Sequence, residues 1–133
     1  AREDWRGALG RIEGKLAANG VLLAFPFHHA AVAAHTYSPR LVVGGGYPTR
    51  TGSLLWYEPP ASFRGYAFEG LRSLDDAGEV FGRLGRAFDL CLLSDEPDGR
   101  KTTALFGAFE ALGRTEPFDT GDPRLRALCR ARD

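Results

Sequence analysis

The sequence predicts one α+β domain over residues 1–133: an antiparallel four- or five-stranded sheet, with a central meander, and amphipathic glycine-rich helices packed on one of its faces. The length of 133 residues and the apolar fraction of 44% suit a single hydrophobic core. Two segments carry an apolar stripe at helical spacing, and each runs into a short apolar stretch. The segments between them are strand-like and rich in aromatic residues.

The first predicted helix spans residues 2–19, where Trp5, Leu9, Ile12 and Leu16 share one face. A second helix spans residues 73–88 and has acidic residues in its first turn, where they favour the helix dipole. Each helix also carries a row of glycines, which predicts that a neighbour approaches the bared backbone closely. These glycines are Gly7, Gly10 and Gly14 in the first helix, and Gly78, Gly82 and Gly85 in the second.

Five segments have the character of strands. Residues 21–27 and 88–93 are short, continuous apolar runs, which is typical of strands that are buried on both faces. Residues 40–43, 53–58 and 63–71 form the predicted meander, with a long glycine-rich loop at 44–52. Residues 28–37 are compatible with either helix or strand.

The last third of the chain predicts two more helices. Residues 101–112 place Leu105, Phe109 and Leu112 on one helical face. Asp122-Pro123 has the pattern of a helix cap followed by a first-turn proline, which predicts a short final helix through residue 130.

The charge balance, the apolar runs and the cysteines indicate which binding partners and which cellular location to expect. Seventeen basic residues balance seventeen acidic ones, so no overall field favours nucleic acid. The longest apolar run is too short to span a bilayer, and no signal-peptide pattern precedes it, which argues against a membrane partner. Cys91 and Cys129 are expected to be reduced, buried thiols, because a chain of this length needs no disulfide. We therefore expect a cytoplasmic protein.

The chain contains no Met and begins at Ala1. Two explanations stay open: an initiator Met has been removed, or the sequence is a segment of a longer protein.

All the histidines, His28, His29 and His35, lie within eight residues after a predicted strand. Imidazole titrates near neutral pH, so these side chains are candidates for general acid–base catalysis. No carboxylate or cysteine lies within that segment, and its spacing is not that of a metal site, so no metal is predicted.

The loop from Gly44 to Gly52 is a candidate site for a small anionic ligand. Its glycines free backbone N–H groups for an anion, and its threonine and arginine side chains add donors. A strand follows this loop where a nucleotide-binding loop needs a helix. The candidate binding residues are Gly45, Gly46, Thr49, Arg50 and Thr51.

A third polar segment, residues 94–103, leaves a strand and enters a helix. Its three acidic residues and its spacing do not match a phosphate-binding loop, and they predict a solvated turn.

Aromatic residues crowd the predicted meander. Strand alternation sends Trp56 and Tyr57 to opposite faces, so one of them must leave the helix-covered core. Together with Arg64 and Tyr66 they have the composition of a protein-binding surface.

Two functions follow. The first is a non-catalytic binding or regulatory domain that uses this aromatic sheet face to engage a protein partner or a second copy of itself. The alternative is a small enzyme or ligand-binding domain, whose anion-binding pocket is formed by His28, His29 and the Gly44–Gly52 loop with Arg50. The sequence contains no nucleophile motif and no paired carboxylates that would favour catalysis, and it indicates no cofactor.

Overall fold

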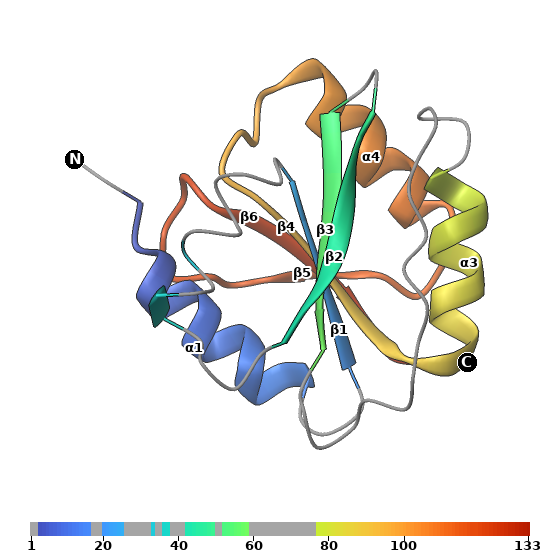
Figure 1. Cartoon of the computed structure of the whole chain (residues 1–133), viewed down its shortest axis with the longest axis horizontal. Coiled ribbons are helices and arrows are strands. Elements are labelled where there is room, and N and C mark those ends of the chain that lie inside the picture. The colour runs from blue at the N-terminus through green and yellow to red at the C-terminus, as the bar shows by residue number, and fades with distance from the viewer. Residues whose placement is uncertain are drawn as a thin grey trace.

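A computed structural model shows a mixed β-sheet with helices on both sides (Figure 1). The structure describes residues 3–16, 20–25, 33, 36–37, 42–49, 52–58 and 77–133. In the described residues the α+β class is confirmed. No helix among these residues has the length and apolar character needed to cross a membrane.

The sheet has six strands in the order β2-β3-β1-β4-β6-β5. Its centre is a parallel pair, β1 (Gly20–Phe25) and β4 (Asp89–Ser94). The hairpin of β2 (Val42–Thr49) and β3 (Gly52–Glu58) pairs antiparallel with one side of β1. On the other side, β6 (Arg126–Arg130) pairs antiparallel with β4, and β5 (Glu116–Phe118) forms the edge.

The expected antiparallel meander is therefore only partly right. Two antiparallel runs exist, but they are joined by the parallel pair at the centre of the sheet. Both strands of that pair are the continuous apolar runs recognised in the sequence, and such runs are typical of parallel strands.

Helix α1 (Trp5–Leu16) covers one face of the sheet. Its buried side chains Leu9 and Ile12 pack in one core with Leu22 of β1, Leu93 of β4 and Ala127 of β6. The predicted helix is present but begins at Trp5, inside the predicted range 2–19, because Asp4 accepts a hydrogen bond from the Gly7 N–H at 2.9 Å and so caps the first turn.

Helices α3 (Ala77–Ala87) and α4 (Arg100–Glu110) cover the opposite face. There Leu23 and Leu92 meet Phe81 and Phe109, whose rings stack edge to face with centroids 5.5 Å apart. The expectation that the helices lie on one face is thus wrong. A strand that is apolar at every position needs cover on both sides.

Only two of the predicted glycine contacts are close, and both are made by side chains: Asp4 lies against Gly7, and Arg130 lies against Gly85. At Gly85 of α3 an added Cβ would lie 2.8 Å from Nη1 of Arg130, whereas Gly10, Gly14 and Gly78 have nothing within 4 Å. The glycine rows therefore do not mark a general close approach of backbone.

The predicted final helix is wrong, because residues 126–130 form strand β6. Asp122 does cap a turn: its Oδ1 accepts the Arg124 N–H at 2.9 Å, and Leu125 N–H bonds to the Asp122 carbonyl at 3.0 Å. The chain then extends, with Ala127 and Leu128 in the cores on opposite faces. Packing against β4 outweighs the local helix signal.

The expected long loop at 44–52 is also shorter in the structure. Strands β2 and β3 pair as far as Thr49 and Gly52, with an irregularity between Val43 and Gly45. Pro48 is accommodated because β2 is an edge strand. The predicted strand at 63–71 and most of residues 28–37 lie outside the described residues.

The two cysteines form a disulfide, so the expectation of free thiols is wrong. Cys91 of β4 and Cys129 of β6 are directly paired across the two strands, with their sulfurs 2.11 Å apart. Both are buried on the face that α1 covers.

Candidate functional site at one edge of the sheet

One edge of the sheet gathers the ends of several elements. Strands β1 and β4 are parallel and end side by side, with Phe25 paired to Ser94. Strand β3 runs opposite to β1 and has its first residue, Gly52, beyond that end. Strand β6 starts here too, since Arg126 pairs with Ser94. In open sheets of this kind, ligands bind at the carboxyl ends of parallel strands.

The segment between β4 and α4 forms a compact turn at this edge. Ser94 Oγ accepts the Glu96 N–H at 3.0 Å and lies 3.4 Å from Thr102 Oγ1, and both hydroxyl side chains are fully buried. Gly99 N–H closes the turn on the Glu96 carbonyl at 3.0 Å. The residue that precedes α4 is Gly99, which has no side chain to cap the first turn of the helix.

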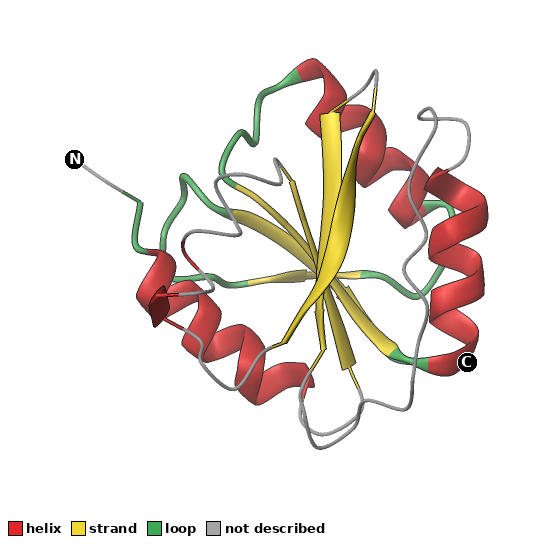
Figure 2. Cartoon of the chain, in the orientation of Figure 1, coloured by secondary structure: helices red, strands yellow, loops and turns green. Residues whose placement is uncertain are grey.

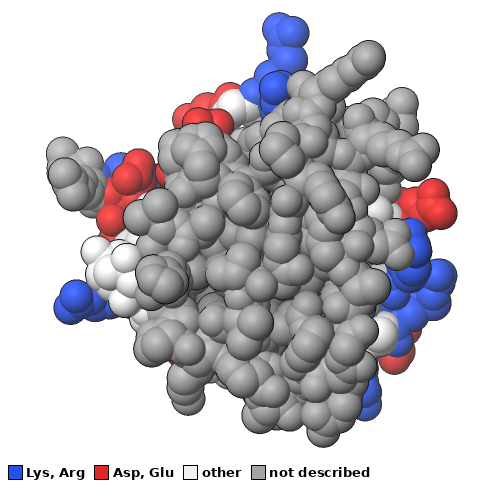
Figure 3. All heavy atoms as spheres, viewed as in Figure 1, with Lys and Arg blue, Asp and Glu red and all other residues white. Residues whose placement is uncertain are grey.

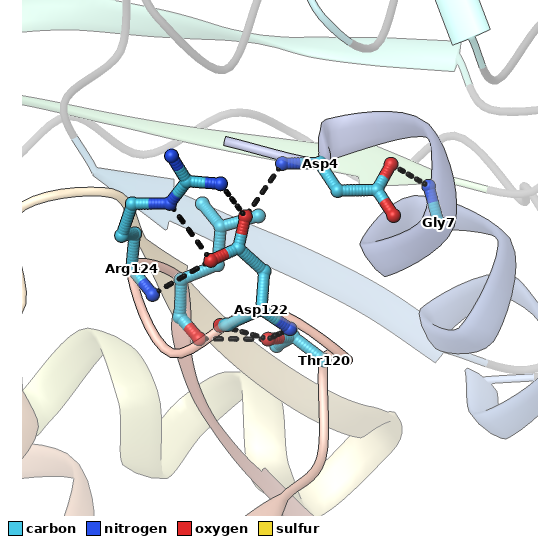
Figure 4. Close-up of polar contacts among 6 residues, drawn as sticks. Asp4, Gly7, Thr120, Asp122 and Arg124 are labelled. Atoms are coloured by element: carbon cyan, nitrogen blue, oxygen red, sulfur yellow. Dashed lines mark hydrogen bonds and ion pairs between the residues drawn. The ribbon is translucent and has the colours of Figure 1, made fainter. Parts of the chain in front are cut away.

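The segment between β5 and β6 is organised around one carboxylate, that of Asp122 (Figure 4). Its oxygens accept bonds from the Arg124 side chain at 2.9 and 3.0 Å, from the Arg124 N–H at 2.9 Å, and from the Asp4 N–H at 2.7 Å. The side-chain bond to Arg124, followed by the two backbone bonds, holds the pKa of Asp122 well below its usual range.

Thr120 fixes the other side of the same loop. Its Oγ1 lies 2.8 Å from the carbonyl oxygens of both Asp122 and Leu125, and accepts the Asp122 N–H at 3.2 Å. Because the Asp4 N–H also binds Asp122, the loop is joined to the start of α1. The shape of the loop is therefore fixed by hydrogen bonds within the chain.

A hollow of about 520 Å³ lies between the two loops, and we call it the edge hollow. This volume is in the range of small-molecule sites. Its wall is apolar at Pro97, Pro117 and Leu128. Its charged residues are Arg126, Asp119, which pairs with Arg11 at 3.4 Å, and Asp122, which pairs with Arg124. The complete lining is Pro97, Pro117, Phe118, Asp119, Thr120, Gly121, Asp122, Pro123, Leu125, Arg126, Ala127 and Leu128.

Arg126 is held in place from α4. Its guanidinium lies over the Phe106 ring, 4.3 Å from the centroid, and Nη2 is 3.4 Å from Glu110 Oε1. The side chain keeps 38% of its surface exposed, so it has donors available to a ligand.

Charged side chains of both signs lie on the described surface. Figure 3 shows acidic and basic side chains interspersed around the rim of one view. This agrees with the balanced charge of the sequence. Binding at the edge hollow would depend on local groups.

The structure brings together only part of the predicted site. Gly45, Gly46 and Thr49 lie in strand β2. Trp56 and Tyr57 lie in β3, at register positions opposite Leu23 and Leu22. The side chains of these strand residues lie outside the described part, as do all of His28, His29, His35, Arg50, Thr51, Arg64 and Tyr66.

Sequence reasoning missed the loop at 119–125 and Arg126. The signal available was the turn chemistry of Thr120, Gly121, Asp122 and Pro123, which we assigned to a helix start. The role of Arg126 depends on the pairing of β6 with β4, which local sequence does not reveal.

Within residues that the structure describes, no three His, Cys, Asp or Glu side chains are grouped closely enough to hold a metal ion. The green loop segments of Figure 2 that follow β4 and precede β6 mark the candidate site. Comparison of the chain with protein-family models, with curated proteins and with solved structures finds no match.

Proposed function

We propose that the chain is a ligand-binding domain, and that a small organic anion occupies the edge hollow. The observation that carries this is a hollow of about 520 Å³ beside the 119–125 loop, whose lining includes Pro97 from the segment after β4 and Arg126 at the start of β6. Apolar walls suit the body of such a ligand, and Arg126 suits its charged group.

The anion site expected from the sequence stays a prediction, because His28, His29 and Arg50 lie outside the described residues.

Nuclear magnetic resonance titration tests this proposal. A panel of small carboxylates, phosphates and amines is added to the labelled chain, and we expect an anion to shift the amide signals of residues 119–128. Arg126→Gln should weaken that binding about tenfold, the effect of one charge-assisted hydrogen bond. Arg86→Gln, an exposed arginine at the end of α3, is the matched control. If no compound shifts these signals, or Arg86→Gln weakens binding as much, the proposal is wrong.

A protein-binding role for the aromatic hairpin is the second candidate. It is favoured by the position of the hairpin, since β2 is an edge strand and β3 separates it from β1. Trp56 pairs with Leu23, which lies in the core under α3 and α4. Tyr57 pairs with Leu22, which lies in the core under α1. Light scattering tests self-association: a dimer that Trp56→Ala or Tyr57→Ala converts to monomer supports this role, and a monomer at all concentrations argues against a second copy as the partner.

A cytoplasmic location stays our expectation from the sequence, and the disulfide sets a condition on it. Disulfides persist mainly in oxidising compartments, and in the cytosol they are mostly transient and redox-active. The Cys91–Cys129 bond must therefore be either protected outside the cytosol or open to exchange within it.

A further inference from the structure

A second hollow, of about 320 Å³, lies beside the disulfide at the β5 side of the sheet, and we call it the disulfide hollow. Its lining includes Cys129 of β6, Phe118 of β5 and Lys15 of α1, but not Cys91. It shares only Pro117 and Phe118 with the edge hollow. Cys129 is therefore the sulfur-bearing residue nearer to solvent, although only 3% of it is exposed.

We propose that the disulfide hollow is a thiol–disulfide exchange site, at which a low-molecular-weight thiol attacks Cys129. The volume admits a small molecule and leaves little room for a protein loop. This inference is independent of the ligand proposed for the edge hollow.

The strand register places the hollow on the correct side for attack. A thiolate displaces a sulfur from a disulfide in line, so it must approach Cys129 from the side away from Cys91. Cys129 pairs with Cys91 on one side and with Glu116 of β5 on the other. Glu116 and Phe118 line the disulfide hollow, so a thiol within it faces Cys129 from the β5 side.

The pairing of β4 with β6 holds the two cysteines opposite each other. Their Cα atoms are 4.1 Å apart, and each cysteine lies within its strand rather than at the end.

The charged groups around the hollow favour a thiolate. Lys15 and Arg114 are exposed cations of its lining, and Arg130 is a buried one. Asp133 accepts from both Arg130 and Arg114, at 2.5 and 2.6 Å, and Glu116 is the carboxylate of the lining. Three cations against two carboxylates leave a net positive charge, which stabilises an approaching anion.

The exchange balances in two steps. The small thiolate forms a bond to Sγ of Cys129, the Cys129–Cys91 bond breaks, and Sγ of Cys91 leaves with the electron pair and takes the proton that the small thiol released. A second thiolate attacks the sulfur of the first, and Cys129 leaves and is protonated. Two small thiols are oxidised to one small disulfide, and the protein disulfide is reduced to two thiols.

The first test measures reduction of the native chain by 2-mercaptoethanol, quenched by alkylation and read by mass. Direct attack predicts a rate proportional to thiol concentration that changes less than twofold in 1 M urea. If reduction required global unfolding, 1 M urea would raise the rate about tenfold, because it raises the unfolded fraction by that order. A tenfold rise would overturn the proposal.

The second test identifies the attacked sulfur. Cys91→Ser leaves Cys129 free, and Cys129→Ser leaves Cys91 free, in a matched pair. With bis(2-hydroxyethyl) disulfide, we expect Cys129 to form the mixed disulfide at least tenfold faster than Cys91 in native buffer, and equally fast in 6 M guanidinium. Equal native rates, or a faster Cys91, would contradict the inference.

A third variant tests the electrostatic part. Lys15→Glu should slow reduction of the wild-type disulfide severalfold, because it reverses a charge in the hollow. Lys101→Glu, at the start of α4 on the other face, is the matched control. Equal slowing by both variants would show that the cations of the hollow play no part.

Discussion

Asp122 shows how one side chain can define a loop. Four donor groups converge on its carboxylate, which is only 4% exposed. Three of these donors belong to Arg124, and the fourth is the backbone N–H of Asp4, just before α1. The carboxylate therefore joins two segments that are 118 residues apart in the sequence. The charged form makes these bonds, and protonation weakens them.

This arrangement predicts acid-labile stability. The pKa of Asp122 is lowered in the folded state, so the unfolded chain takes up its proton first, near its ordinary pKa of about 3.9. The stabilisation is present above that pH and is lost as pH falls below it. We expect Asp122→Asn to lower the melting temperature at pH 7, and the gap to wild type to narrow as the pH falls from 4 towards 2.

Circular dichroism melts across this pH range check the prediction, with the exposed Asp98→Asn as the control. Asp133 also has a lowered pKa, owing first to its bond with Arg130 and then to that with Arg114, so Asp122→Asn should keep some acid sensitivity. A gap that stays constant from pH 7 to pH 2 would show that the charge on Asp122 is unimportant.

At the scale of elements, α3 and β6 meet at Gly85 and Arg130. The buried Arg130 donates from Nε to the Gly113 carbonyl at 2.9 Å, and Nη1 lies 3.5 Å from the Gly85 carbonyl. The missing side chain at Gly85 gives the guanidinium its room. A buried arginine is tolerated when its N–H donors have hydrogen-bond acceptors, as those of Arg130 have here.

Gly85→Ala should therefore destabilise the fold, although alanine is the better helix former. Its Cβ would lie 2.8 Å from Nη1, so Arg130 must shift, and we expect the free energy of unfolding to fall by about 1–3 kcal/mol. Gly10→Ala in α1 is the control, since nothing lies within 4 Å of its Cβ, and it should raise stability by roughly 0.5–1 kcal/mol. Urea unfolding measures both, and a gain at Gly85 would contradict the packing described.

The elements that sequence reasoning located correctly are those with a strong local period. The stripes of α1 and α3 and the apolar runs of β1 and β4 are properties of neighbouring residues. The failures depend on distant residues: residues 126–130 follow the helix-cap pattern of Asp122-Pro123, but pairing with β4 makes them a strand. The disulfide follows from that same pairing, so it was missed with the strand.

For the candidate site the same limit applies. The sequence predicts a glycine-rich loop at Gly44–Gly52. In the structure, most of this segment lies in the edge strand β2, which pairs with β3. The edge hollow arises where loops 95–99 and 119–125 meet, which requires the order β4-β6-β5. Sequence alone identified neither that neighbourhood nor Arg126.

At the scale of the whole molecule, the sheet is a shared wall between two cores. Leu22 lies in the core under α1, and its neighbour Leu23 lies in the core under α3 and α4. Both are fully buried. The two cores consist of different buried side chains and lie on opposite faces of the sheet. Each core must therefore be well packed for the fold to be stable.

Single truncations on the two faces test this architecture. We expect Leu22→Ala and Leu23→Ala each to lower the free energy of unfolding by about 3 kcal/mol, because each removes buried methyl groups and leaves a cavity. If helices covered only one face of the sheet, only one of the two substitutions would lower stability, because the other leucine would already be exposed to solvent. Urea unfolding of both variants distinguishes the cases, with Ala104→Ser at an exposed position of α4 as the control. A loss below about 1 kcal/mol for either leucine would mean that its face is open in solution, and the three-layer arrangement would then have to be abandoned for the one-sided sheet that the sequence predicts.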